Sequence, residues 1–133
     1  MRLSLVTLLV RDYDEAIAFY GAMPGFRTIV DKRLAEADAR GRPKRWVVVG
    51  LERGPGLLLA RADTDEQEAR IGDQAGGRVA LFLETDDFAR DAEALQRLGA
   101  RFEEAPRNEA YGRVAVWRDP FGNRWDLIEP ASG

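Results

Sequence analysis

Apolar positions occur along this chain in two kinds of pattern, short continuous runs and runs at helical spacing. Residues 3–10 (LSLVTLLV) are apolar and partly β-branched, which predicts a buried strand. Asp12 then precedes Glu15 by three residues, a spacing close to a capping box, and the apolar residues that follow recur at helical spacing. The pattern therefore predicts a helix that begins after Asp12 and ends at the Pro-Gly-Phe stretch 24–26.

The rest of the first half predicts three strands and then a connection. The strands are expected at 26–30, 46–51 and 56–62, with a polar segment at 35–45 that contains a Gly-Arg-Pro turn signal. Residues 63–77 are polar, contain a short helical piece and end in two glycines. We interpret 63–77 as a linker.

The second half repeats this order. A strand is predicted at 78–84, and Asp86 or Asp87 caps a helix with apolar residues at helical spacing. Gly99 stands where a C′ glycine is expected, as Gly25 stands after the first helix. Three more strands are predicted, at 101–105, 111–117 and 124–129, the last two joined by the turn RDPFGN.

Each half is thus a βαβββ unit with one open apolar sheet face, which it cannot bury alone. We predict an α+β fold in a single domain, with two βαβββ modules and eight mostly antiparallel strands curving around a central cleft. Module one spans 1–62, the linker 63–77 and module two 78–130. A cleft between the modules is the natural place for a ligand.

Composition excludes several classes of partner. The chain has 133 residues, a length typical of one domain, and a net charge of −3 with no concentrated Lys/Arg face. We therefore expect no nucleic-acid partner. No apolar run approaches the roughly 20 residues that span a bilayer, so we expect no membrane partner and a cytoplasmic location.

Two residue types are missing. The chain has no Cys, which excludes disulfides, thiolate nucleophiles and Cys-based zinc sites. It has no His, which excludes a Ser-His-Asp triad and removes the commonest metal ligand and general base. Carboxylates, amides and carbonyls remain as metal ligands, and these suit Mg²⁺, Ca²⁺ or Mn²⁺ better than zinc.

Two motifs resemble a known family. The stretch VRDYDEAIAFY followed by Gly-Phe, together with RDPFGNRWDLIEP near the C-terminus, is similar to the vicinal oxygen chelate superfamily. That superfamily includes glyoxalase I, extradiol dioxygenases and the bleomycin and fosfomycin resistance proteins. The resemblance covers almost the whole chain, from Leu3 to Glu129, and IGDQAGGRVALFLETDDF resembles members known only as glyoxalase-like.

The resemblance also implies where a metal would sit. In the enzymes of the superfamily one divalent metal has ligands on the first, fourth, fifth and eighth strands. Those positions correspond here to the neighbourhoods of Leu5, Leu58 and Ala80, and to Asp126. Three of the four are apolar, and a catalytic metal needs about three protein ligands. We therefore expect a glyoxalase-like member that lacks the usual metal ligands and has no cofactor.

Asp126 and Glu84 are the candidate catalytic residues. Glu84 shares a face with Ala80 because strand side chains alternate. In one interpretation the two acids converge, with Gln74 or Thr7 as neutral partners. Alternatively, Asp126 forms a structural ion pair with a neighbouring arginine, and Glu84 is a surface acid at the end of its strand. The arginines available for such a pair are Arg78, Arg113 and Arg124.

The predicted ligand-binding residues also include side chains outside this pair. Arg78 follows two glycines, and Tyr111 precedes Gly112 at the mouth of a strand. Aromatic residues can cage a planar or cationic ligand, although they lie more often in a core. The full set is Asp126, Glu84, Arg78, Tyr111, Trp46, Trp117 and Thr7.

Three functions follow. The first is a metal-independent binding protein of the resistance type that sequesters a small aromatic or cationic compound as a homodimer. The second is a metal-independent isomerase or lyase with Glu84 or Asp126 as base, since burial can raise a carboxyl pKa. The third is a divalent-metal lyase or dioxygenase.

Overall fold

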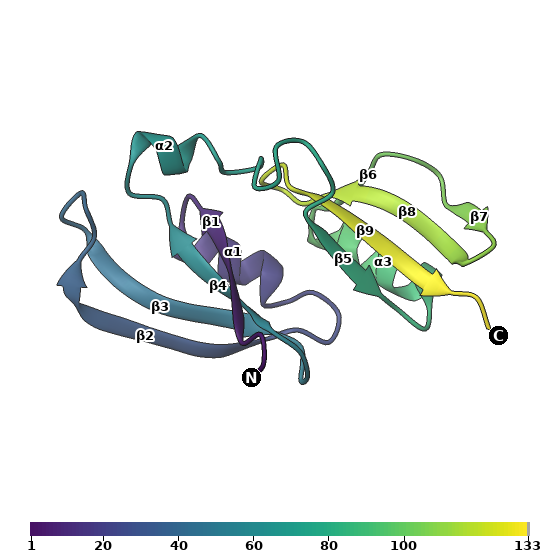
Figure 1. The fold of residues 1–133 in the computed structure, drawn as a ribbon, viewed down its shortest axis with the longest axis horizontal. Coiled ribbons are helices and arrows are strands. Elements are labelled where there is room, and N and C mark those ends of the chain that lie inside the picture. Colours follow the sequence, from purple (N-terminus) through teal and green to yellow (C-terminus); the bar gives the residue numbers. More distant parts are fainter. Residues whose placement is uncertain (133) are drawn as a thin grey trace. The chain divides into compact units, whose positions relative to one another are not determined.

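The protein is described by a computed structural model, which covers residues 1–132. The chain divides into two compact units, the first Met1–Ile71 and the second beginning at Gly72. The boundary falls inside residues 63–77. Each unit contains a helix packed on a sheet (Figure 1). No helix within residues 1–132 is long and apolar enough to cross a membrane.

The first unit is built on a four-stranded sheet in the order β1-β4-β3-β2. Strand β1 is parallel to β4, and the other pairs are antiparallel. Helix α1 contributes Tyr13, Ala16, Phe19 and Tyr20 to the core of the unit. The elements are β1 (Leu5–Val10), α1 (Tyr13–Tyr20), β2 (Arg27–Ala37), β3 (Pro43–Gly50), β4 (Gly56–Arg61) and α2 (Asp65–Glu68).

Helix α1 begins as predicted and ends earlier than predicted. The Asp12 side chain accepts a hydrogen bond from the Glu15 amide at 2.8 Å, which confirms the cap. The helix stops at Tyr20 because Gly21 closes it, with its amide donating to the Ile17 carbonyl. The expected stop at 24–26 was wrong, since Gly25 belongs to the following turn, where it has a φ of 76°.

Strands β2 and β3 are longer than the sequence pattern suggested. Residues 35–45 were read as a polar connection, yet β2 runs to Ala37, which pairs with Pro43 at the start of β3. The turn is held by the Asp38 side chain, which accepts from the amides of Arg40 and Arg42. Hydrogen bonding along the whole hairpin satisfies the backbone amides and carbonyls of these residues. The residues are polar and show no apolar alternation, so the sequence does not indicate a strand there.

The second unit repeats the topology of the first. Its sheet has the order β5-β9-β8-β6, with β7 also paired to β8, and β5 is parallel to β9. The Asp87 side chain caps α3 by accepting from the Arg90 amide, and Gly99 ends α3 in the left-handed conformation. The predicted repeat is confirmed. The elements are β5 (Leu81–Glu84), α3 (Phe88–Leu98), β6 (Arg101–Phe102), β7 (Arg107–Glu109), β8 (Gly112–Arg118) and β9 (Arg124–Pro130).

Residues 1–132 contain nine strands where eight were predicted, because the strand expected at 101–105 is interrupted. Both β6 and β7 pair with the same edge of β8. Between them the Glu104 side chain accepts from the Val116 amide at 2.9 Å, in place of a strand carbonyl. Pro106 follows and has no amide proton to donate, so regular pairing resumes only at Arg107.

Strand β5 is shorter than predicted. It was expected to start at Arg78, but it starts at Leu81. Gly76 and Gly77 have positive φ angles of 65° and 92°, which extended backbone does not use. Pairing begins only where the Ala80 amide donates to the Arg124 carbonyl.

Candidate functional site

The second sheet has one face covered by α3 and one face that α3 leaves open. Side chains alternate along β9, so Trp125 and Leu127 lie on the covered face while Asp126 lies on the other. Asp126 pairs in register with Phe82 on β5 and with Val116 on β8. These three residues form one row across the open face, and Phe82 is 64% exposed. An apolar ring and a carboxylate thus stand side by side.

Asp126 carries a polar atom with no partner. Its Oδ1 is buried and accepts no hydrogen bond within the described part of the chain. Burial raises the pKa of the Asp126 carboxyl, and the positive charge of Arg107 opposes that shift. Buried acceptors are almost always satisfied by protein groups or by water, so this oxygen is free to accept a hydrogen bond from water or from a ligand.

None of the arginines proposed as ion-pair partners takes that role. Arg124 pairs with Glu103, its Nε lying 2.8 Å from Oε2. Arg113 lies over the Phe88 ring, with its Cζ 4.9 Å from the ring centroid. The prediction of a structural ion pair at Asp126 is therefore wrong for these arginines within residues 1–132.

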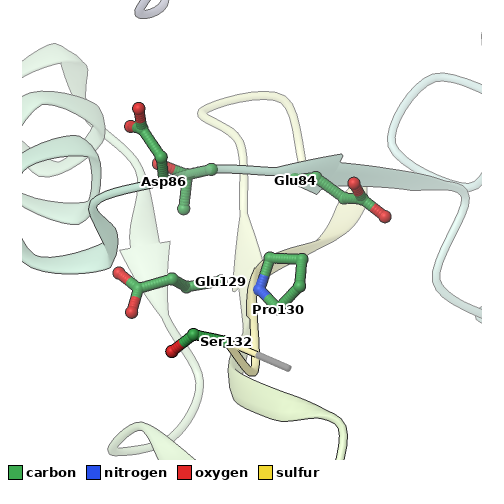
Figure 2. A pocket seen from close by; sticks show the side chains of 6 residues that line it. Glu84, Asp86, Glu129, Pro130 and Ser132 are labelled. Carbon is green, nitrogen blue, oxygen red and sulfur yellow. The ribbon is translucent and has the colours of Figure 1, made fainter.

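Glu84 stands apart from Asp126. It is the last residue of β5 and pairs with Ile128, so Phe82 and not Glu84 lies beside Asp126. Glu84 lines a cavity of about 520 Å³ with Thr85, Asp86, Glu129, Pro130 and Ser132. Figure 2 shows its carboxylate pointing away from those of Asp86 and Glu129.

The other acids of this cavity are engaged in the start of α3. The Glu129 side chain accepts from the Phe88 amide at 2.7 Å, and Asp86 pairs with Arg90. The Thr85 hydroxyl donates to Asp91 at 2.5 Å. These contacts satisfy polar groups at the N-terminus of α3. The acids Asp86 and Glu129 of this cavity therefore have a structural role.

Two predicted ligand-binding residues lie in the first unit. Thr7 is exposed on β1, where it pairs with Leu58. Trp46 is 38% exposed on β3, where it pairs with Lys32. Alternation places both on the face of the first sheet opposite the buried Leu8 and Val47.

The two remaining aromatic candidates, Trp117 and Tyr111, differ in exposure. Trp117 has no exposed surface, and its ring stacks on Trp125 with centroids 5.1 Å apart. The two tryptophans are cross-strand partners on the covered face, which puts Trp117 in the core rather than in a ligand site. Tyr111 is 57% exposed in the turn between β7 and β8.

Arg78 lies just before β5 and borders two depressions of the second unit. Its guanidinium has no hydrogen-bond or ion-pair partner among the described residues. One depression, of about 380 Å³, is lined by Gly77, Arg78, Val79, Phe82 and Arg124. Arg78 thus lies next to the exposed ring of Phe82.

Comparison with known proteins places the chain. Residues 2–127 match the family described as the Glyoxalase/Bleomycin resistance protein/Dioxygenase superfamily. The chain belongs to this superfamily. It is 50% identical over 126 residues to an uncharacterized protein of Shewanella frigidimarina (strain NCIMB 400), covering 93% of this chain and 90% of that one.

Two solved structures are similar to this chain in fold. UcmS2 is similar with a TM-score of 0.77 and 28% identity, over 97% of this chain and 98% of the other. TnmS3, an antibiotic binding protein from Streptomyces sp. CB03234, has a TM-score of 0.70 and 27% identity, over 98% of this chain and 97% of the other.

The donor set does not fit the metal that enzymes of the superfamily carry. Leu5, Leu58 and Ala80 offer no side-chain donor at three of the corresponding positions. Across residues 1–132, no group of three or more acids lies close enough together to hold an ion. Only Asp126 remains, and one carboxylate does not make a catalytic metal site.

The site predicted from the sequence did not include Phe82. It also did not include Glu103 and Glu104, which pair with Arg124 and Arg107. Phe82 sits between Leu81 and Leu83, and a continuous apolar run hides which residue is exposed. Glu103 and Glu104 read as an ordinary polar end of a strand. Strand alternation from Ala80 places Phe82 on the same face as Glu84, but the predicted ligand-binding set did not include Phe82.

Proposed function

We propose that this protein binds a small organic compound that places an apolar or aromatic surface on Phe82 and a hydrogen-bond donor or positive charge against Asp126. The observation that supports this proposal is the buried Oδ1 of Asp126, which accepts no hydrogen bond, beside a ring that is 64% exposed. A ligand donor would satisfy the acceptor and the ring would lose its contact with water.

The relatives support a binding role. TnmS3 is an antibiotic binding protein, and its structure aligns with nearly the whole of this chain at 27% identity. We propose that the compound bound by this chain is aromatic or cationic, and that it is sequestered without chemical change. The sparse donor set leads us to propose that binding is independent of metal.

A metal-independent isomerase or lyase is the second candidate. The raised pKa of Asp126 favours it, because a desolvated carboxylate is a stronger base than one in water. Glu84 supports it less well, since its side chain is exposed at the end of β5. Binding and catalysis differ in the fate of the compound.

The test is a thermal-shift and equilibrium-dialysis screen of antibiotics and aromatic amines. The bound compound is then recovered and its molecular mass is measured by mass spectrometry. A binding protein releases the compound unchanged. A free ligand concentration of 100 times Kd should stabilise the folded state by about 2.7 kcal/mol. We expect Asp126→Asn and Phe82→Ala to weaken binding. Asp86→Asn is the matched control, because the Asp86 side chain is 89% exposed and pairs with Arg90.

Two results would overturn the proposal. One is turnover of a bound compound with a pH–rate profile that Asp126→Asn abolishes, which would establish the enzyme. The other is a ligand whose affinity is the same in wild type, Asp126→Asn and Phe82→Ala, which would place the site elsewhere.

We also propose that the protein is a cytoplasmic homodimer, as is common in the superfamily. Sedimentation at micromolar concentration checks the dimer. Metal content after incubation with Mn²⁺, Ni²⁺, Zn²⁺ or Fe²⁺ and desalting checks metal independence, for which we expect far less than one ion per chain.

A further inference from the structure

Three arginines gather around a small depression at one end of the second sheet. Its volume is about 130 Å³, well above the roughly 10–15 Å³ that holds one water molecule. The arginines come from the loop before β5, from the end of β8 and from the start of β9. The lining of the depression includes Asp73, Gly77, Arg78, Arg118 and Arg124.

Two of the arginines are held in place by the same acid. Glu103 receives Arg124 through two hydrogen bonds, of 2.8 and 3.1 Å, and Arg118 Nε lies 3.1 Å from Glu103 Oε2. Hydrogen bonds from Arg124 hold the pKa of Glu103 below its usual value, so Glu103 is ionised at neutral pH. One carboxylate thus neutralises only one of these two charges.

Backbone carbonyls fix the same two guanidinium groups. Arg124 donates to the Gly77 carbonyl at 3.0 Å, and Arg118 donates to the Gly122 carbonyl at 3.2 Å. The first bond also fastens the loop that carries Arg78. An arginine pair positioned in this way loses little side-chain freedom when it binds a ligand.

Arg78 is the third arginine, and its guanidinium has no side-chain or carbonyl partner within residues 1–132. Glu103 pairs with Arg118 and Arg124, Asp73 also lines the depression, and the charges of Glu104 and Asp126 act on Arg124. The unpartnered donors of Arg78, and not a net positive charge, are therefore the feature that favours an anion. A fork of N–H donors with no acceptor, beside a cavity, matches the geometry of an oxyanion.

We propose that this depression is an oxyanion subsite that binds a carboxylate or phosphate group, with Arg78 as the principal donor and Arg118 and Arg124 as the positioned pair. The larger depression that contains Phe82 shares Gly77, Arg78 and Arg124 with it. This inference rests on the proposed function: the natural compound carries an acidic group close to its aromatic part.

The test is a titration of ¹⁵N-labelled protein with inorganic phosphate and, separately, acetate, at low ionic strength where screening is weak. We expect saturable shifts of the Gly76 and Gly77 amides and of the arginine Nε–H groups. Arg78→Gln should weaken the tighter anion at least tenfold. Arg53→Gln is the matched control, an exposed arginine of the first unit with the same change in charge, and it should change affinity less than twofold.

The two anions separate the possible chemistries. Tighter phosphate binding assigns the subsite to a phosphate group, and tighter acetate binding assigns it to a carboxylate. Phenyl phosphate and benzoate then show whether an attached ring adds affinity that Phe82→Ala removes.

Shifts spread over the whole surface, or equal affinity in wild type and Arg78→Gln, would overturn the subsite. If neutral or cationic aromatic compounds still bind in an Asp126-dependent way, the proposed function stands without it. If the anions bind at Arg78 and no organic compound depends on Asp126 or Phe82, the subsite stands and the proposed function fails.

Discussion

The two faces of the second sheet differ in how deeply their side chains are buried, although the same strand contributes to both. On the face covered by α3, Trp125 and Leu127 have 1% and 2% of their surface exposed, and Trp117 is stacked on Trp125. On the open face, Asp126 is only partly buried and Phe82 is 64% exposed. Adjacent residues of β9 therefore lie in the core and on the open face in turn, because their side chains point in opposite directions.

Two aspartates show the same contrast at the level of hydrogen bonds. Asp119 is fully buried and accepts from Trp125 Nε1, from Asn123 Nδ2 and from the amides of Phe121 and Asn123. Asp126 has a buried oxygen that accepts from none of the described residues. The hydrogen bonds of Asp119 hold the turn between β8 and β9, whereas the free oxygen of Asp126 supports the binding role that we propose.

The largest effect is expected from Trp125→Ala. Removing this ring opens a cavity under α3 and breaks the stack with Trp117, so the free energy of unfolding should fall by about 3–5 kcal/mol. Urea denaturation measures the loss. The control is Trp46→Ala, whose ring is 38% exposed and should cost far less. Equal losses would mean that the covered face is not the core.

Asp119→Ala should have the next largest effect. It leaves the donors of Trp125 and Asn123 buried without an acceptor, at a cost of about 1–3 kcal/mol. Thermal unfolding compared with Asp86→Ala, which removes an exposed acid, measures this cost. A variant as stable as wild type would show that the turn between β8 and β9 does not need Asp119.

Asp126→Asn should have a smaller effect, opposite in sign and dependent on pH. Burial raises the folded-state pKa of Asp126 above the unfolded value of about 3.9, so the contribution of this group to stability is greatest below that value. It is lost as the pH rises through the folded-state pKa, and ionised Asp126 destabilises the fold at neutral pH. The variant should therefore have a higher Tm than wild type at pH 7.

Melting curves of wild type and Asp126→Asn from pH 3 to pH 8 check this sign. The gain should disappear at the acid end, where wild-type Asp126 is also neutral. A variant that melts below wild type at pH 7 would instead reveal an ion pair that stabilises the fold.

Phe82→Ala should have the smallest effect on stability. An exposed ring contributes little to folding, so the free energy of unfolding should change by no more than about 0.5 kcal/mol. Ligand affinity should nevertheless fall. One unfolding measurement and one affinity measurement would then distinguish the open face from the covered face. Phe88→Ala is the matched comparison, because that ring is 2% exposed on α3 and its loss should destabilise the protein strongly.

The sequence was sufficient wherever the signal is local. Asp12 was identified as a helix cap, and Asp87 was one of the two residues predicted for the second cap, because a cap bonds an amide three residues away. The order of the elements in both halves revealed the internal repeat, which the two matching sheet topologies confirm. The full extent of β2 escaped prediction, because its backbone is paired by β3 and not by any periodicity of its own residues.

Sequence alone determined the family, the paired βαβββ modules and the position of Asp126 on the last strand, since each is encoded in a short motif or a repeated pattern. Only the tertiary structure decided that Trp117 is core, that Phe82 rather than Glu84 stands beside Asp126, and that three arginines share one depression. Register and burial depend on strands that lie far apart in the chain, and no local pattern specifies which residues those strands bring together.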